Sequence, residues 1–212
     1  MNKKIITGIL IVVLIIVLIF IYGTRAPSAP SQDIDSVVNN STASTSQNYK
    51  ISKSSVVEFR IDEILRDKPF TAVGTSSEIA GDISISDDTV TIGTLAINAK
   101  TFKTDDERRD GAITRLILKS EDPANEFITF VPTSIERMAN SLNITGQLTI
   151  SGITKPAVFV ASINVTDESI TGTATSTIKR SDYNLVIPNI PFVASVDDDF
   201  MIVTKIVADR VR

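Results

Sequence analysis

The sequence predicts a mainly β protein, an antiparallel barrel or sandwich with one short amphipathic helix, preceded by an N-terminal transmembrane helix. Three observations carry this prediction. Residues 49–212 alternate apolar and polar side chains with a period of two, a single segment near residue 110 has helical spacing, and the chain begins with a long apolar run. Alternation over many short segments is typical of antiparallel sheets that bury one face.

The composition excludes several kinds of chemistry. Cysteine and histidine are both absent from the 212 residues, so disulfide bonds, the usual Cys and His zinc sites, and Ser-His-Asp or Cys-His catalysis are excluded. The net charge is −4, and residues 49–212 carry 18 basic against 23 acidic side chains. This balance argues against a nucleic-acid partner, because binding to phosphates needs a basic surface.

The N-terminal segment Met1–Thr24 is predicted to anchor the chain in a membrane. Lys3 and Lys4 precede the uncharged run Ile5–Thr24, which has about the ~20 residues that a spanning helix needs. The two lysines outweigh Arg25 on the other side, so the N-terminus should face the cytoplasm and the C-terminal domain the periplasm or the exterior. A cleaved signal peptide is the alternative, although its apolar core usually has only ~7–15 residues.

Residues 25–48 are predicted to be a flexible linker. They are mostly Ser, Thr, Pro, Ala, Asn and Gln, with Ile34, Val37 and Val38 as the apolar residues of any size. Such a composition cannot bury enough apolar surface to offset the entropy of ordering. A flexible chain of this length reaches roughly 25–30 Å on average, so the following domain could stay near the membrane and still reorient.

Residues 49–212 are predicted to form one β domain. Val57, Phe59 and Ile61 alternate with charged residues, and the same period returns in three further groups: Ile83 and Ile85; Leu142, Ile144, Leu148 and Ile150; and Phe200, Ile202, Ile206 and Ala208. Turns are expected at Asp87–Asp88, Ser151–Gly152, Asp167–Glu168 and Asp197–Asp199. Val90 and Ile92 share one parity while Leu95 and Ile97 share the other, so a bulge or bend at Gly93 should re-aim that strand.

One segment has helical spacing instead. Thr104 and Glu107 form a capping box, with Thr104 as the N-cap residue. The apolar residues that follow at helical spacing are Ala112, Ile113, Leu116 and Ile117. A short amphipathic helix is therefore predicted over Asp105–Leu118, packed against part of the sheet and weakened by Gly111.

Several segments, taken in order, resemble the YceI-like family of polyisoprenoid-binding proteins. The closest is GQLTISGITKPAVF at 146–159, which is similar to the family's Gly-x-Leu-Thr-Ile-x-Gly-Val-Thr-Lys-Pro-Val. The others are YKISKSSVVEFRI (49–61), GDI (81–83), TFKTDDERRD (101–110), ITRLILKSEDPANEFITF (113–130), IKRSDYNL (178–185) and SVDDDFMIVTKIVA (195–208). Their order and spacing across residues 49–212 make the resemblance specific.

The resemblance implies an extended, eight-stranded antiparallel barrel of the lipocalin kind. It also implies an apolar tunnel that holds a polyisoprenoid, such as a quinone tail or a polyprenyl chain. The chain departs from the family where Glu63 and Ile64 replace a common His, and where Asn184 replaces a Gly. These departures leave the preference for a head group open.

An eight-stranded barrel is either filled by its own side chains or able to hold one small ligand. The candidate lining residues are Val57, Phe59, Ile61, Ile83, Leu116, Phe127, Phe130, Leu148, Ile150, Phe159 and Phe200. Phe127 and Phe130 have opposite strand parity, so at most one of them should point inward. The alternative for every residue in this set is a simple role in the core.

Charged clusters carry the remaining site hypotheses. Arg108, Arg109 and Asp110 are candidate contacts for a lipid head group, with ion pairing on the helix surface as the alternative. Asp197–Asp199 could offer oxygen ligands to Ca²⁺ but lack the spaced pattern of a dedicated loop, so a solvated turn is expected and no metal site is predicted. Asp105–Glu107 are explained as charges that stabilise the N-terminus of the helix, and no catalytic residue is assigned.

The leading hypothesis is a protein without enzymatic activity that binds, transports or stores a long-chain apolar lipid outside the cytoplasm. A polyisoprenoid or an isoprenoid quinone is the expected ligand, and no other cofactor is expected. The expected partners are this lipid and the membrane, a homodimer stays open, and no nucleic acid is expected. The alternatives are an envelope surface interaction module with a filled barrel and a small hydrolase that uses carboxylates.

Overall fold

A computed structural model of the chain describes residue 34 and residues 47–86, 89–188 and 193–211. The chain divides into two units, Met1–Pro30 and Ser31–Arg212, and the second is described below. The predicted transmembrane helix Met1–Thr24, most of the linker and the predicted turn at Asp87–Asp88 lie outside the described residues. No helix of the described part is long and apolar enough to cross a membrane. The anchor and its alternative, a signal peptide, therefore stay predictions.

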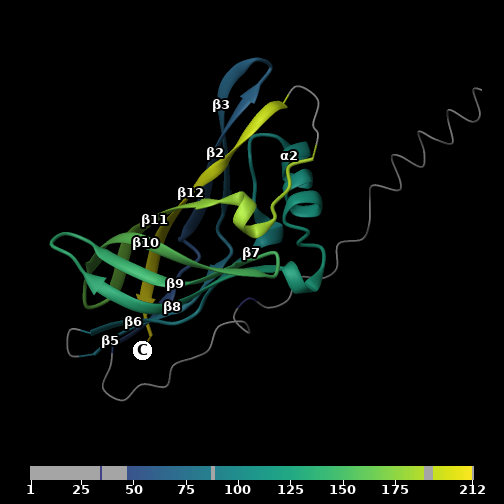
Figure 1. Cartoon of the computed structure of the whole chain (residues 1–212). Coiled ribbons are helices and arrows are strands. Elements are labelled where there is room, and N and C mark those ends of the chain that lie inside the picture. Colours follow the sequence, from purple (N-terminus) through teal and green to yellow (C-terminus); the bar gives the residue numbers. More distant parts are fainter. Residues whose placement is uncertain (1–33, 35–46, 87–88, 189–192, 212) are drawn as a thin grey trace, which may run out of the picture. The chain divides into compact units, whose positions relative to one another are not determined.

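Most of the described residues lie in strands of one sheet (Figure 1). The strands are β1 (Gln47–Ile51), β2 (Val56–Leu65), β3 (Lys68–Ser76), β4 (Ile79–Ala80), β5 (Asp82–Ser86), β6 (Thr89–Ile92), β7 (Leu95–Asn98), β8 (Phe127–Arg137), β9 (Leu142–Ile150), β10 (Ile153–Val165), β11 (Ser169–Lys179) and β12 (Val193–Arg210). Between β7 and β8 lie η2 (Ala99–Thr101), α2 (Glu107–Ala112), η3 (Ile113–Ile117) and η4 (Pro123–Asn125), and η5 (Arg180–Tyr183) precedes β12.

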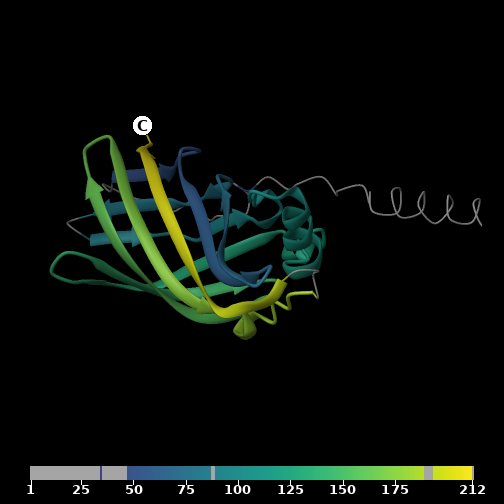
Figure 2. The same cartoon turned by 90° about the horizontal axis from the view of Figure 1, so that it is seen from above.

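The sheet is antiparallel throughout and curls around an interior. Hydrogen-bonded neighbours follow the order β4-β7-β8-β9-β10-β11-β12-β1-β5-β6, and β2 pairs with both β12 and β3. Seen from above, the strands wrap around this interior and α2 lies at one end (Figure 2). The predicted mainly β, antiparallel fold with one short helix is confirmed. The strand count is twelve rather than eight, because bends divide the longer β segments.

The two-residue period sets which side chains face the interior. Val57, Phe59 and Ile61 of β2 pair with Thr204, Ile202 and Phe200 of β12, and both rows point inward. On β9, Leu142, Ile144, Leu148 and Ile150 are buried. Since side chains in a strand alternate between faces, these rows leave the polar residues between them outside.

Bends occur where the sequence carries glycine. Gly81 separates β4 from β5, and Gly93 with Thr94 separates β6 from β7. The Gly93 N–H donates to the Asp82 carbonyl at 2.9 Å, so the interruption stays tied to the neighbouring strand. Ile92 and Leu95 both line the interior across this break, which agrees with the predicted change of parity.

Two further glycines make room for aromatic rings. A Cβ atom on Gly74 would overlap the ring of Phe59. A Cβ atom on Gly146 would lie 2.6 Å from Cζ of Phe130 and 2.5 Å from the Val131 carbonyl oxygen. The absent side chains therefore leave room for both rings, and this role explains a glycine inside strands that would otherwise disfavour it.

Two of the predicted turns connect hairpins. Ser151 (φ 47°) and Gly152 (φ 76°) join β9 to β10, and both have the positive φ that a two-residue hairpin loop of type I′ requires. Asp167 and Glu168 lie between β10 and β11, where the Thr166 N–H donates to the Ser169 carbonyl at 2.9 Å.

The predicted helix is shorter and begins later than expected. The N-cap residue is Asp106, whose side chain accepts from the Arg108 N–H at 2.8 Å, so the capping box on Thr104 was wrong. The helix is α-helical only to Ala112 and continues as a π-helix over Ile113–Ile117. Thr104 cannot act as the cap, because its N–H and hydroxyl both donate to the Asp110 carboxylate. Asp106 therefore accepts from the free Arg108 N–H at the start of the helix.

The predicted turn at Asp197–Asp199 was also wrong. All three residues lie within β12, where the register against β2 shifts between Val196 and Phe200. The extra residues form a bulge, and the Arg180 guanidinium donates to the Asp197 carbonyl at 3.0 Å. Asp198 accepts from the Ser181 N–H (2.9 Å) and hydroxyl (2.7 Å). The acidic run therefore fixes η5 to the strand.

Candidate functional site

The curled sheet encloses an apolar cavity of about 740 Å³. This volume falls within the range of roughly 300–1,000 Å³ that is usual for ligand pockets. Its walls come from nearly every strand and from the α2–η3 segment. The interior is therefore hollow, whereas an interaction module with a filled barrel would have no such space.

Most of the predicted lining residues lie around this cavity. They are Val57, Phe59, Ile61, Ile83, Leu116, Phe130, Leu148, Ile150, Phe159 and Phe200. Phe127 does not line it, because it pairs with Asn98 and has the opposite parity to the buried Phe130. The structure thus places ten of the eleven predicted lining residues around one cavity. Their contact with a ligand stays a prediction.

Small inward-facing residues create the empty space. Ala72, Ala161, Gly172 and Ala174 all line the cavity, and Gly172 and Ala174 occupy successive inward positions of β11. Larger side chains at the alanine positions would occupy part of this space, whereas a Cβ atom on Gly172 would lie 2.8 Å from the Ser162 carbonyl oxygen of β10. The predicted lining residues are all large and apolar and do not include these small ones, although Gly172, Ala174 and Ser176 share one parity of β11.

Aromatic pairs make up part of the wall. The rings of Phe130 and Phe159 meet edge to face with their centroids 4.9 Å apart and an interplanar angle of 65°. Phe59 and Phe102 lie 5.6 Å apart at 58°. Such pairs add stability beyond their buried area, so this side of the cavity is a firm surface for an apolar ligand.

A buried tyrosine lies at the β1 end of the interior. Tyr49 is 0% exposed and pairs with Ile83 of β5 and Arg210 of β12. Its hydroxyl is a donor within reach of the Gln47 side-chain oxygen (2.8 Å) and the Thr166 carbonyl (3.1 Å). The adjoining Ile51 and Ile83 line the cavity whereas Tyr49 does not, so Tyr49 forms part of the floor behind them.

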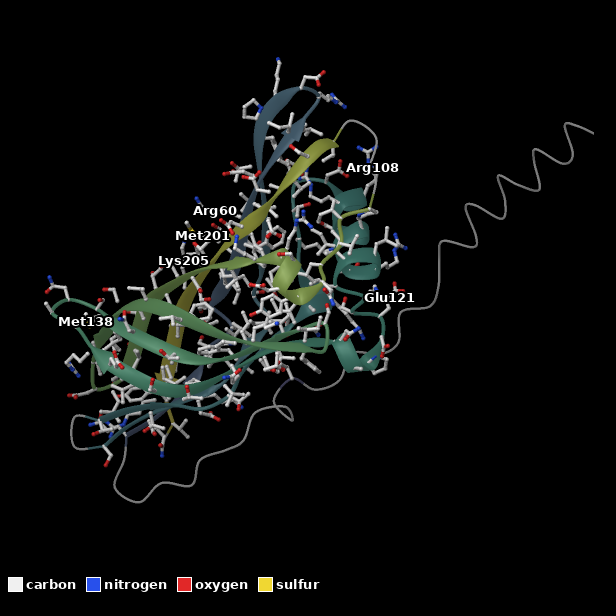
Figure 3. All side chains as sticks on the ribbon, viewed as in Figure 1. Arg60, Arg108, Glu121, Met138, Met201 and Lys205 are labelled. Atoms are coloured by element: carbon white, nitrogen blue, oxygen red, sulfur yellow. The ribbon has the colours of Figure 1, made fainter. Side chains whose placement is uncertain are left out.

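The charged lining residues gather mainly toward the helical end. The charged side chains of the lining are Glu58, Glu63, Arg66, Arg108, Arg109 and Arg180. Figure 3 shows Arg108 beside α2, far from Met138 at the tip of the β8–β9 hairpin. Leu116, which is 56% exposed, lines the cavity from the same helical segment. This end therefore combines exposed apolar and basic groups, as the rim of a lipid site would.

The two adjacent arginines of α2 have different surroundings. Arg109 lies 3.4 Å from the buried Glu63, 2.5 Å from Asp105, and over the Phe70 ring at 5.3 Å. It is thereby held between the helix and the β2–β3 hairpin. The Arg108 side chain is 91% exposed and pairs with Asp106 at 2.9 Å. Of the two, Arg108 is the one that can turn toward a bound molecule.

Asp110, the third predicted head-group contact, has a structural partner instead. It is buried and accepts from the Thr104 N–H at 2.7 Å and the Thr104 hydroxyl at 2.8 Å. Lys103 lies 3.5 Å away, and Asp110 is not among the residues that line the cavity. Its carboxylate closes the loop before α2.

Asp110→Ala should therefore destabilise the domain by about 2–3 kcal/mol, because two partly buried donors of Thr104 lose a charged acceptor. Urea unfolding followed by circular dichroism measures this loss. Glu107→Ala is the matched control, since that side chain is exposed on the same helix, and its effect should stay within ~0.5 kcal/mol. Equal stability of the two variants would contradict the role given to Asp110.

Asp106 gives the start of α2 a dependence on pH. Hydrogen bonds from the side chain and backbone of Arg108 lower the pKa of Asp106 from 3.8 to about 2. The pKa is lower in the folded state, so the stabilisation is present above the unfolded value and is lost as the pH falls toward 2. We expect the first turn of α2 to fray in this window. The NMR signal of the Arg108 amide should report the change, and an Asp106→Asn variant should not show it.

The site gives no positive support to a hydrolase. Its two lining carboxylates are both ion-paired, Glu58 with Arg60 and Glu63 with Arg109. Within the described residues, no cluster of three or more acidic side chains is arranged to hold a metal ion. The arrangement is suited to binding an apolar molecule.

Comparison with known proteins adds independent findings. A family model described as YceI-like domain matches residues 49–208. A search of curated proteins finds no match. Among solved structures, BcnA of Burkholderia cenocepacia has a TM-score of 0.62 at 17% sequence identity, covering 74% of this chain and 98% of its own.

Two more structures have the same fold. A polyisoprenoid binding domain from Saccharophagus degradans, implicated in plant cell wall breakdown, has a TM-score of 0.62 at 13% identity, with 77% of this chain and 98% of its own covered. The YCEI protein of Campylobacter jejuni has a TM-score of 0.55 at 21% identity, with 66% and 84% covered. At these identities the likeness concerns the fold.

Proposed function

This chain belongs to the family of YceI-like domains, and on that basis we propose that its β domain binds a long apolar lipid in the cavity of the curled sheet. The proposed ligand is a polyisoprenoid chain or the tail of an isoprenoid quinone. The proposed role is to carry or store this lipid, without catalysis. One solved relative of the same fold is described as a polyisoprenoid binding domain, which supports this choice of ligand.

The observation that carries the proposal is the hollow, apolar interior. A cavity of about 740 Å³ lined by phenylalanine, isoleucine, leucine, valine and alanine side chains has no use in a protein that needs only a stable core. Protein interiors are normally packed as densely as organic crystals. Leaving apolar walls without partner atoms costs stability, and a bound apolar chain would restore those contacts.

The hydrophobic effect is large enough for such binding. Burying a CH₂ group contributes about 0.8 kcal/mol, so one isoprene unit contributes up to roughly 4 kcal/mol gross. The bilayer also solvates such a chain, and ordering the ligand offsets part of the gain. Selectivity should therefore depend on the dimensions of the cavity and on a few polar groups along it.

We further propose that the strands correspond to an eight-stranded, lipocalin-like barrel. β1 and β2 both pair with the same edge of β12. The next group is β3, β4 and β5, which follow one another with short interruptions. The third group is β6 and β7, which are separated only at Gly93–Thr94. Counting each group as one strand and adding β8 to β12 gives eight. In that arrangement the pairs β5·β6, β4·β7 and β7·β8 complete the circuit.

The proposed location of the domain is outside the cytoplasm, held near a membrane. This part rests on the sequence alone, since the apolar run Ile5–Thr24 follows Lys3 and Lys4. A domain on a flexible linker near a bilayer could exchange a lipid with that bilayer. Protease accessibility of the tagged C-terminus in intact cells, compared with permeabilised cells, tests the orientation.

Arg108 is the proposed contact for a polar head group at the rim. It lines the cavity, its side chain is 91% exposed, and its carboxylate partner is Asp106, the N-cap residue of the same helix. A head group emerging between α2 and the β2–β3 hairpin would meet this guanidinium. Arg109 is assigned a supporting role, because Glu63, Asp105 and Phe70 already hold it.

Mass spectrometry of an organic extract from the purified domain tests the proposed function directly. The expected result is an isoprenoid or quinone at near-stoichiometric amount. Titration of lipid-free domain should then raise its melting temperature, since ligand at 100 times its Kd adds about 2.7 kcal/mol. A domain that yields no lipid and gains no stability from quinones or polyprenols would rule the proposal out.

A further inference from the structure

The side chain of Thr204 is a polar group at the deep, apolar part of the cavity. Thr204 of β12 lies at an inward position between Ile202 and Ile206, is 8% exposed, and lines the cavity. The outer face of the same strand carries Met201 and Lys205, which Figure 3 labels on the outside of β12. In the part of the chain that the structure describes, the Thr204 hydroxyl makes no hydrogen bond.

The two cross-strand partners of Thr204 have hydrocarbon side chains. Thr204 pairs with Ala174 of β11 and Val57 of β2. Both neighbours line the cavity and neither offers a donor or an acceptor in its side chain. The hydroxyl is open to the cavity, and a purely apolar ligand packed against it would cover it without a partner. Covering an unpaired hydroxyl costs free energy, so a ligand that supplies a hydrogen bond there is favoured.

Thr204 is also remote from the charged rim. Its partner Val57 lies eight residues along β2 from Leu65, the lining residue at the other end of that strand, which corresponds to about 26 Å of extended strand. Arg66 and Arg108 belong to that other end. The nearby Glu58 has the opposite parity to Val57 and is paired with Arg60. The deep part therefore lacks a charged partner for an ionised ligand group.

We propose that the Thr204 hydroxyl is a selectivity-determining contact, which binds a neutral oxygen of the lipid near the floor of the cavity. The inference rests on the proposed function and narrows its ligand class to lipids with an alcohol or carbonyl oxygen at the end that enters first. A lipid whose only polar group stays at Arg108 is then disfavoured, because its hydrocarbon end would face Thr204. A hydroxyl can both donate and accept, so it serves either group. A pure hydrocarbon leaves it unpaired, and sites with buried polar groups discriminate strongly against ligands that cannot satisfy them.

The test compares geranylgeraniol with the hydrocarbon that lacks only its hydroxyl, using lipid-free wild-type domain and Thr204→Val. Valine keeps the shape and removes the hydroxyl. Wild-type domain should prefer the alcohol, and Thr204→Val should bind the alcohol roughly 3- to 10-fold more weakly and the hydrocarbon at least as well as wild type. Thr177→Val, on the exposed side of β11, is the matched control and should change neither affinity.

The outcomes separate this inference from the function on which it rests. Binding of both probes by wild type, with the same ratio of affinities in Thr204→Val, overturns the selective role of Thr204 and leaves lipid binding standing. Failure of wild type to bind either probe overturns the proposed function and the inference together. The melting temperature of ligand-free Thr204→Val should not fall below that of wild type, since the variant removes an unpaired polar group.

Discussion

Ala174→Phe should weaken lipid binding by about 100-fold and leave the domain folded. Ala174 lies at an inward position of β11 and lines the cavity beside Thr204, its cross-strand partner on β12. A phenyl group there would project into empty space and displace part of any bound chain. Displacing three or four CH₂ groups at about 0.8 kcal/mol each weakens binding by about 100-fold or more. Isothermal titration with a quinone or a polyprenol measures the loss.

The matched control is Thr171→Phe, which adds the same ring on the exposed side of β11. It should bind lipid like wild type. Far-ultraviolet circular dichroism and the melting temperature show whether each variant is folded, and Ala174→Leu makes the same test with a smaller insertion if the phenyl group is not accommodated. A folded Ala174→Phe protein with unchanged affinity would mean that lipid binds outside the cavity.

This experiment depends on residues that the sequence does not single out. The large apolar side chains could be assigned to one face of the strands, because Val57, Phe59 and Ile61 alternate with charged residues. A row of large residues predicts a core, filled or hollow. Whether the core is filled or hollow depends on small residues such as Gly172 and Ala174. A period of two shows which face of the strand they occupy, but it carries no information about which residues lie across the interior.

The errors at the rim have a related cause. Thr104, Asp106 and Asp110 all carry oxygen atoms that can cap a helix or close a loop, and sequence spacing favours Thr104 with Glu107. In the structure Asp110 is buried and holds Thr104, which leaves Asp106 as the cap. Burial of a single carboxylate decides the assignment. The loop that it closes is paired with β3 through Thr75 and Lys103, a contact between distant parts of the sequence that forms only on folding.

The Asp197–Asp199 run was misassigned for a different reason. Three consecutive carboxylates normally mark a solvated turn, but here they lie in a bulge of the longest strand, Val193–Arg210. Arg180, more than ten residues earlier in the sequence, donates to the carbonyls of Val196 and Asp197. These hydrogen bonds stabilise the bulge within the strand. A local pattern cannot reveal a partner supplied by another element.

Tyr49→Ala should have the largest effect on stability. Tyr49 is fully buried at the β1 end, and truncation of a buried aromatic side chain to alanine costs about 3–5 kcal/mol. Since domains of this size are stable by only about 5–15 kcal/mol, the variant should unfold at markedly lower urea concentration and temperature. Chemical unfolding of the lipid-free domain, followed by circular dichroism, gives the difference.

Tyr49→Phe separates the ring from its hydroxyl. That variant keeps the buried area and loses only the contacts to Gln47 and the Thr166 carbonyl, so it should cost about 1 kcal/mol. Because Tyr49 does not line the cavity, both variants should still bind lipid under conditions where they are folded, in contrast to Ala174→Phe. Equal stability of Tyr49→Ala and Tyr49→Phe would mean that the buried ring does not support the floor of the cavity. Loss of lipid binding by folded Tyr49→Ala, with binding kept by Ala174→Phe, would mean that the ligand lies at the β1 end instead of in the cavity.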